Sequence, residues 1–175
     1  VLVLSDRVDE WLVSHLNEYK GKSLHSVAKG DLDLGELADK EEKEAKEKAA
    51  AEHGSLLERL KGALGERVEA VRPSTRLVDS PACLVVGEHD MSANLARVLK
   101  AVGQSAPETR PTLEVNLDHL LVRRLEAESD ETRFAELSLI LFDQAQLAEG
   151  GQLDDPAAFV GRLNKLMLNM MMTGG

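Results

Sequence analysis

The sequence contains little that would support a disulfide framework or an aromatic core. Its 175 residues include one cysteine, Cys83, and aromatic side chains account for only 3% of the chain. A single cysteine cannot form an internal disulfide, which fits a cytoplasmic location. No apolar run reaches the length of a membrane span, and no signal peptide opens the chain. Hydrophobic residues nevertheless make up 43% of the sequence, so we expect an aliphatic, helix-rich core.

The sequence also lacks the residue patterns of a catalytic, metal or nucleic-acid site. The net charge of −10 disfavours binding to phosphate backbones and to anionic membranes. No glycine-rich loop could cradle phosphates, because Gly150-Gly151 is a helix stop. The five histidines have no ligand spacing to a cysteine or to one another: His15, His25, His53, His89 and His119. We therefore expect no catalytic residue, no metal and no cofactor in this chain.

The first 27 residues predict a βαβ unit. Residues 1–4 form an apolar run typical of a buried strand, and the next segment has helical spacing that includes Tyr19 and ends at Gly21. Residues 23–27 can form a second strand. Two strands make a poor sheet alone, and the chain has no initiator methionine. We expect a fragment of a longer polypeptide that begins at the end of an α/β unit spanning residues 1–34.

Residues 35–53 differ in composition from the rest of the chain. Large apolar side chains are almost absent after Leu37, and acidic residues precede lysines at i,i+4 spacing, for example Glu42 and Lys46. The pattern favours a charged, solvated helix that connects two packed bodies. Disorder is the alternative, because a helix with no buried stripe is marginally stable.

Residues 54–175 predict a second, α+β body. Gly54 breaks the charged segment, Ser55 and Glu58 form a capping box, and an apolar stripe ends at Gly65. Alternating or continuous apolar patterns predict strands at residues 68–72, 82–86 and 112–117. Residues 76–78 can extend the first of these strands or pair with it. Asn116 or Asp118 can cap a short helix that follows.

Two helices finish the chain, and the first is apolar nearly all round. It spans residues 130–149, and the second begins at Asp155-Pro156, an N-cap followed by proline at the first helical position. A helix that is apolar all round must be buried all round, which one hairpin partner and one small sheet cannot achieve. We therefore expect two copies to form a four-helix bundle; an intramolecular core helix is the alternative. The expected dimer interface comprises Phe134, Leu137, Leu141, Phe142, Ala145, Phe159, Leu163, Leu166, Met167 and Met170.

A further amphipathic helix is expected between Met91 and Gly103. Its apolar side chains are Met91, Leu95, Val98, Leu99 and Val102, at i, i+4, i+7, i+8 and i+11. The ordinary interpretation packs this stripe on the sheet. The functional interpretation leaves it exposed as an adaptable binding surface, because methionine and leucine side chains can repack around different partners.

Several segments, taken in order, resemble the heat shock protein 90 family, bacterial high-temperature protein G type. Residues 4–11 (LSDRVDEW) resemble the end of that family's middle domain. The segments LGERV and RLVDSPA, at residues 64–68 and 76–82, resemble the start of its C-terminal sheet. Residues 113–119 (LEVNLDH) are similar to its Glu-Leu-Asn-Pro-x-His segment, with Leu117 in place of the proline. LFDQAQLAEG and DP, at residues 141–150 and 155–156, resemble its dimerisation helices.

The resemblance implies a role in assisting protein folding under stress. It identifies residues 1–34 as the end of the middle domain, 35–53 as a connecting helix and 54–175 as the C-terminal dimerisation domain. The full-length parent would bind ATP and magnesium upstream, so this chain would itself be neither an enzyme nor a nucleotide-binding unit. The tail lacks the acidic ending that docks tetratricopeptide co-chaperones. The resemblance further implies contacts with unfolded client proteins through Trp11, Met91, Leu95, Val98 and Leu99.

The expected function is that of the dimerisation and client-binding region of an ATP-dependent, cytoplasmic chaperone that acts as a homodimer. The alternative is a purely structural oligomerisation domain that makes no client contacts of its own. Exposure of the Met91 helix would discriminate between them.

Overall fold

A three-stranded mixed sheet lies at the centre of the described part of the chain. The computed structural model describes Leu12, Leu16 and residues 18–24, 47–87, 90, 103 and 109–173. In the sheet, β5 (Thr112–Val115) lies between β3 (Val71–Pro73), to which it is parallel, and β4 (Ala82–Val85), to which it is antiparallel. Leu113 of β5 is in register with Val71 and Leu84. The predicted strands near residues 82–86 and 112–117 are thus confirmed, as is the α+β class.

The central position of β5 follows from its side chains. Leu113 and Val115 point to one face of the sheet and are fully buried, as strand alternation predicts for a core-facing pair. Glu114, between them, is also buried and requires ionic partners. The middle strand is therefore the one with both faces covered.

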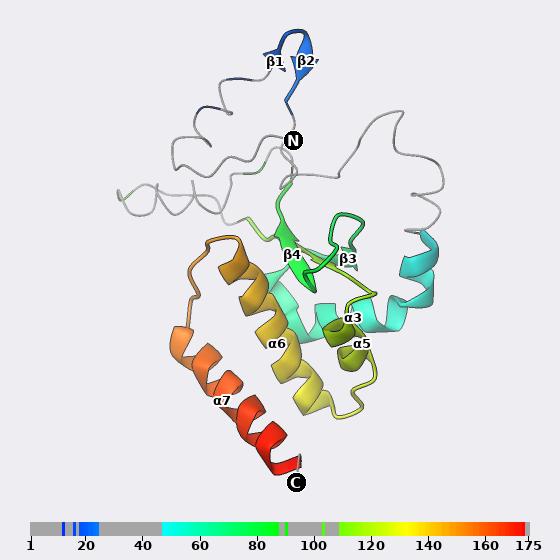
Figure 1. The fold of residues 1–175 in the computed structure, drawn as a ribbon, viewed down its shortest axis with the longest axis vertical. Helices are drawn as coiled ribbons and strands as arrows, with labels where there is room; N and C mark the ends of the chain where they lie inside the picture. The colour runs from blue at the N-terminus through cyan, green and yellow to red at the C-terminus, as the bar shows by residue number, and fades with distance from the viewer. Residues whose placement is uncertain are drawn as a thin grey trace.

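Two helices cover the core-facing side of this sheet. Helix α3 (Gly54–Leu64) contacts β3, and α6 (Glu131–Ala148) contacts β4, while the two helices also pack on each other (Figure 1). The α3 stripe is buried as predicted, with Leu56 added to Leu57, Leu60 and Leu64. Gly65 ends the helix at a φ of 56°, a backbone conformation that disfavours other residues. A short 3₁₀ turn, η2 (Gly65–Arg67), then leads to the buried side chain of Val68.

The remaining helices are α5 (Leu120–Glu126) and α7 (Pro156–Thr173). In Figure 1, α6 lies between α7 on one side and the sheet with α3 on the other. The predicted start of α7 is confirmed, because Asp155 accepts a hydrogen bond from the backbone N–H of Ala158 and Pro156 occupies the first helical position. Asp130 caps α6 in the same way by accepting from the N–H of Arg133. None of the helices in the described ranges has both the length and the apolar character that crossing a membrane requires.

The first predicted helix does not extend to Tyr19. Tyr19 lies instead in β1 (Glu18–Tyr19), which pairs antiparallel with β2 (Lys22–Ser23). Lys20 and Gly21 connect them with φ angles of 51° and 75°, the positive values that a tight two-residue hairpin turn requires. The prediction treated Gly21 as a helix stop, whereas here it forms a hairpin. The predicted strand at residues 1–4 lies outside the described residues.

Three local predictions in the second body are wrong. Ser55 does not cap α3, because residues 47–52 are already helical and the carbonyl of His53 accepts from the N–H of Leu57. Residues 76–78 are not a strand: the Ser74 hydroxyl accepts from the N–H of Arg76 and turns the chain away. His119, and neither Asn116 nor Asp118, caps α5 through its Nδ1 atom.

Asn116 cannot cap α5 because its side chain is engaged elsewhere. Its Nδ2 donates to the carbonyls of Val78 and Ser80, and its Oδ1 accepts from the N–H of Asp118. These bonds fasten the loop after β3 to the end of β5. Strand β3 itself begins at Val71 and not at the predicted Val68, which follows directly after the 3₁₀ turn.

Candidate dimerisation surface

Helix α7 carries an exposed apolar stripe. Val160, Met167 and Met171 occur at i, i+7 and i+11, and at 3.6 residues per turn these positions fall on one face of a helix. Their side chains are 50%, 51% and 79% exposed. The neighbouring face turns toward α6, and its apolar side chains are half-buried: Phe159, Leu163 and Leu166. The stripe is therefore a second apolar face beside the one that α6 already covers.

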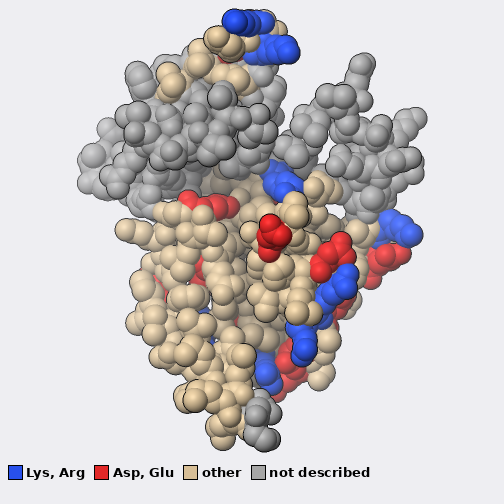
Figure 2. Space-filling view, viewed as in Figure 1, with Lys and Arg blue, Asp and Glu red and all other residues tan. Residues whose placement is uncertain are grey.

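The same region of the surface carries little charge. Figure 2 shows few charged side chains over α6 and α7, whereas lysine, arginine and acidic side chains gather on the opposite side of this view, over α3 and α5. A surface with low charge and exposed leucine, valine and methionine side chains is costly to keep in water and is typical of an association site.

The predicted interface residues of α6 lie in the chain's own core. Phe134, Leu141, Phe142 and Ala145 are buried against α3, the sheet and α5, and Leu137 packs beside them half-buried. The guanidinium of Arg59 also covers the ring of Phe134 at 3.9 Å. Burial of α6 therefore does not require a second copy, because α3, which the prediction omitted, covers this helix as well. The exposed part of the predicted interface is on α7, at Met167 and Met170.

The predicted client-binding residues cannot be placed on this fold. Trp11, Met91, Leu95, Val98 and Leu99 all lie outside the described residues. Of the positions that flank this segment, the carboxylate of Asp90 accepts from the N–H of Gly87, and Gly103 has a φ of 77°.

A buried carboxylate holds α7 against α6. Asp143 of α6 is almost fully buried, and its Oδ2 accepts from Nη2 of Arg162 on α7 at 2.5 Å. Its other oxygen, Oδ1, lies 3.5 Å from Nη1 of Arg67 in η2. A second, more exposed pair joins Lys165 to Glu136 at 2.6 Å. Two cations thus compensate the buried charge of Asp143, and α7 is set in place by a contact that the sequence pattern did not reveal.

The described residues include two hollows of very different size. The seam between α6 and α7 encloses a cavity of about 10 Å³, roughly the space of one water molecule. A larger hollow of about 500 Å³ opens between the loop after β3 and the start of α5. Its lining is Leu77, Val78, Asp79, Asn116, Asp118, His119 and Leu120. Within the described ranges, no group of three histidine, cysteine or acidic side chains could hold a metal ion.

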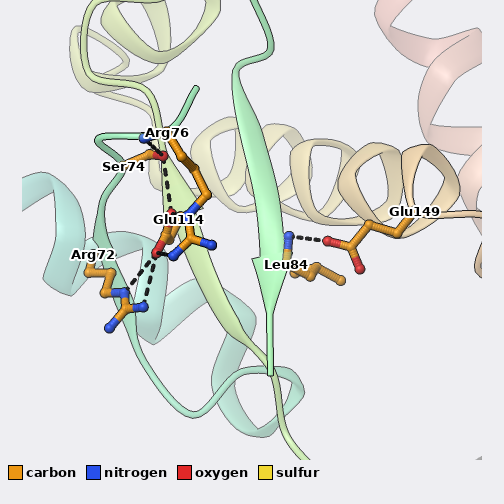
Figure 3. A network of polar contacts seen from close by, with 6 residues as sticks. All are labelled: Arg72, Ser74, Arg76, Leu84, Glu114 and Glu149. Carbon is orange, nitrogen blue, oxygen red and sulfur yellow. Dashed lines mark hydrogen bonds and ion pairs between the residues drawn. The ribbon is translucent and has the colours of Figure 1, made fainter. Parts of the chain in front are cut away.

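Glu114 forms a buried ionic cluster that sequence analysis missed. Figure 3 shows its carboxylate between two arginines: Arg76 Nε lies 2.8 Å from Oε2, and Arg72 Nη2 lies 2.9 Å from Oε1. The Ser74 hydroxyl donates to Oε2 at 3.1 Å. Strand alternation places Glu114 on the face opposite Leu113 and Val115 but does not show that this face is covered. The nearby basic residues at 72 and 76 were the available signal that this face is covered.

Glu149 ties the end of α6 to the edge of the sheet. Its Oε1 accepts at 2.6 Å from the backbone N–H of Leu84, which is a residue of β4 (Figure 3). Removal of the carboxyl from water raises the pKa of Glu149 to about 7, although the Leu84 N–H opposes this shift by stabilising the charged form. The contact lies directly before Gly150 and the connection to α7.

Cys83 is poorly suited to chemistry. It lies half-buried in β4. Burial raises the pKa of its thiol to about 11, and the neighbouring charge of Glu114 acts in the same direction, partly offset by Arg76. Because the thiolate is the reactive form, this cysteine is almost entirely the inert thiol at neutral pH.

Comparison with known proteins relates the whole chain to one family. The family model described as "Hsp90 protein" matches residues 1–174. The chaperone protein HtpG of Alkalilimnicola ehrlichii is 56% identical over 174 residues, which is 99% of this chain and 27% of that protein. The chaperone protein HtpG of Aromatoleum aromaticum is 58% identical over 170 residues, 97% of this chain and 26% of that protein. The chain therefore spans about a quarter of the length of these relatives.

The matches extend from the first residue through α6 and α7, so they include both the described elements and the segments between them. A family model that covers residues 1–174 of 175, together with relatives above half identity over the same span, confirms the resemblance carried by the individual motifs. This chain belongs to the Hsp90 family.

Proposed function

We propose that this chain is the dimerisation and client-binding region of an ATP-dependent molecular chaperone. The observation that carries the proposal is the exposed stripe of Val160, Met167 and Met171, on a helix that Asp143 fixes to the core. The related proteins are named chaperones, which supports a role in protein folding. ATP and magnesium would act in other parts of a longer parent, and this chain would contribute the contact between two copies.

The dimer would form around α7, with α6 as the helix that supports it. A second copy placed across a two-fold axis would cover each stripe with its own counterpart, as in a four-helix bundle. Each apolar side chain that becomes fully buried contributes about 1.5–3 kcal/mol before the ordering of side chains is subtracted. Several such side chains from each copy suffice for association at micromolar concentration.

A double substitution on α7 tests the dimer. Val160→Glu with Met167→Glu places two charges on the stripe and should convert a dimer to a monomer in sedimentation equilibrium. The matched control is Val78→Glu with Leu120→Glu, which adds the same charge at two exposed apolar positions away from α7. The control should remain dimeric. A monomeric unmodified chain at micromolar concentration, or equal dissociation of both variants, contradicts the proposal.

Client binding is proposed at the apolar side chains of the Met91 helix, with Trp11 as a further contact. Its support is the family membership and the Met-Leu-Val spacing of that segment. Met91→Ser with Leu95→Ser should weaken binding of a partly unfolded protein and leave thermal stability and dimer mass unchanged. Leu120→Ser with Leu121→Ser, on the exposed surface of α5, is the control. If stability falls and client affinity does not, the stripe is ordinary core and the alternative of a purely structural oligomerisation domain stands.

The proposal also assigns no nucleotide site to this chain. Isothermal calorimetry with ATP and magnesium should show no saturable binding, since the sequence holds no phosphate loop. Saturable binding would contradict this assignment without affecting the proposed dimer.

A further inference from the structure

The hollow between the loop after β3 and the start of α5 has apolar side chains on both of its walls. Its volume is about 500 Å³. Val78 from the loop and Leu120 from the helix are 84% and 67% exposed, and Leu77 beside them is half-buried. In Figure 1, α5 and α7 lie on opposite sides of α6, so a second copy seated on α7 approaches from the other side. The hollow is therefore an apolar surface separate from the one proposed for the dimer.

One buried amide holds both walls of the hollow in place. Asn116 is 7% exposed, and its Nδ2 donates to the carbonyls of Val78 and Ser80 at 3.1 and 3.3 Å. Its Oδ1 accepts from the N–H of Asp118, and its carbonyl accepts from the N–H of His119, the N-cap of α5. The loop and the start of α5 are thus fixed to the same residue. Such a preformed surface loses little freedom on binding and selects among ligands because it does not repack.

The polar groups of the lining favour a cation and a peptide carbonyl. Both charged side chains among the lining residues are acidic, Asp79 and Asp118. Asp118 already pairs with Arg123 at 2.7 Å, whereas the exposed carboxylate of Asp79 has no ion-pair partner within the described ranges. His119 accepts the N–H of Leu121 with its Nδ1, so the neutral ring carries its proton on Nε2, which can donate to a ligand.

We propose that this hollow binds a partner protein through an extended segment in which an apolar side chain is followed by lysine or arginine. The apolar side chain would lie between Val78 and Leu120, and the cation would pair with Asp79. A backbone carbonyl of the segment would accept from Nε2 of His119. Burial of the apolar side chains supplies affinity, and the carboxylate selects cationic segments and repels acidic ones. The site is distinct from the client contact proposed at the Met91 helix, and it does not depend on the dimer.

The probe is a fluorescent peptide with a Leu-Arg pair between flexible Gly-Ser flanks, and its binding to the full chain is followed by fluorescence anisotropy. Binding should be saturable. Val78→Ser with Leu120→Ser should weaken it about tenfold, because two apolar contacts are lost. Both side chains are exposed, so circular dichroism and dimer mass should remain unchanged. A peptide with Leu-Gln in place of Leu-Arg should bind about threefold more weakly, as expected for the loss of one exposed ion pair.

Charge reversal separates this hollow from the general attraction of an acidic chain for cations. Asp79→Lys should reverse the preference, so that a Leu-Glu peptide binds more tightly than the Leu-Arg peptide. Glu58→Lys, at an exposed position of α3 outside the lining, makes the same change in net charge and should keep the preference for Leu-Arg. The same preference in both variants, or no saturable binding by the native chain, overturns the proposal and leaves the dimer standing.

A partly unfolded protein distinguishes a selective partner site from a second client contact. Met91→Ser with Leu95→Ser should bind the Leu-Arg peptide as the native chain does. Val78→Ser with Leu120→Ser should bind the unfolded protein as the native chain does. If this second variant loses the unfolded protein and the peptide to the same extent, the hollow is a client contact and the proposal of a selective partner site is wrong.

Discussion

Helices α6 and α7 are equally long but differ in burial. Each has 18 residues and a high content of apolar side chains. In α6 four consecutive side chains, from Ile140 to Asp143, are buried, so the middle of the helix is covered on nearly all sides. In α7 no described side chain is buried, and Met167 and Met171 are exposed. The composition of a helix therefore does not decide its burial; the number of neighbouring elements does.

The neighbours explain the contrast. Helix α6 contacts β4, α3, α5 and α7, whereas the main contact of α7 within the described residues is with α6. A helix with a single neighbour buries one stripe and leaves the opposite one in water. The apolar side of α6 serves folding, and the apolar side of α7 remains available for a second chain.

The largest expected effect is the loss of stability when a buried side chain of α6 is truncated. Phe134→Ala removes a fully buried ring that also contacts Arg59, and it should lower the free energy of unfolding by about 3–5 kcal/mol at every protein concentration. Met172→Ala on α7 is the control and should change it by less than about 0.5 kcal/mol. Urea denaturation at several protein concentrations measures both. Comparable losses in the two variants would show that α7 is as buried as α6.

The second effect concerns the contact that joins the two helices. Asp143→Ala leaves Arg162 without its buried partner and should lower the free energy of unfolding by about 3 kcal/mol. This value is the lower end of the range for a broken buried pair, because the second partner of Asp143, Arg67, is partly exposed. Asp118→Ala, which removes an exposed pair with Arg123, should cost less than about 1 kcal/mol. The variants are compared by urea denaturation. A small effect at Asp143 would indicate that α7 is positioned by apolar contacts alone.

Sequence patterns predicted the two helices well because their signals are local. Asp130 and the Asp155-Pro156 pair mark the N-termini through hydrogen bonds within one turn, and both were confirmed. Burial of α6 on nearly all sides was also predicted correctly for its middle, although Leu147 near its end is exposed. Its partner was not, because α3 is distant from α6 in the sequence, with 72 positions between the paired Arg59 and Glu131, and periodicity does not encode which apolar faces meet.

The missed polar contacts share the same origin. Glu114 is buried by Arg72 and Arg76, and Glu149 is held by the N–H of Leu84, 65 positions away in sequence. Such pairs depend on the strand order β3-β5-β4, which no local pattern specifies. The proposed dimer surface on α7 is identified by the exposure of its apolar side chains. Helical periodicity alone does not distinguish an exposed apolar stripe from one that packs in the core.

The third effect depends on pH and acts where α6 ends. The folded pKa of Glu149 is about 7, above its ordinary 4.5, so the folded state binds the proton more tightly. The stability that this proton contributes is present below about pH 4.5 and is lost as the pH rises through 7. Glu149→Gln keeps an acceptor for the Leu84 N–H and should remove this loss. The stability of the native chain relative to the variant should therefore fall between pH 5 and pH 8 in urea denaturation. A native chain that gains relative stability over that range would mean that the charged carboxylate is preferred.

The smallest effect is expected at the exposed pair between the helices. Glu136 on α6 and Lys165 on α7 lie 2.6 Å apart, but the lysine side chain is more than half exposed. A double-mutant cycle with Glu136→Ala and Lys165→Ala should give a coupling energy of about 0–1 kcal/mol at low salt. At about 1 M salt, where the screening length is about 3 Å, the coupling should vanish. Asp143, shielded from water and ions, should keep its coupling with Arg162 under the same conditions. A salt-insensitive Glu136–Lys165 coupling would mean that the whole seam between α6 and α7 is dry and that α7 is more deeply buried against α6 than its exposed side chains indicate.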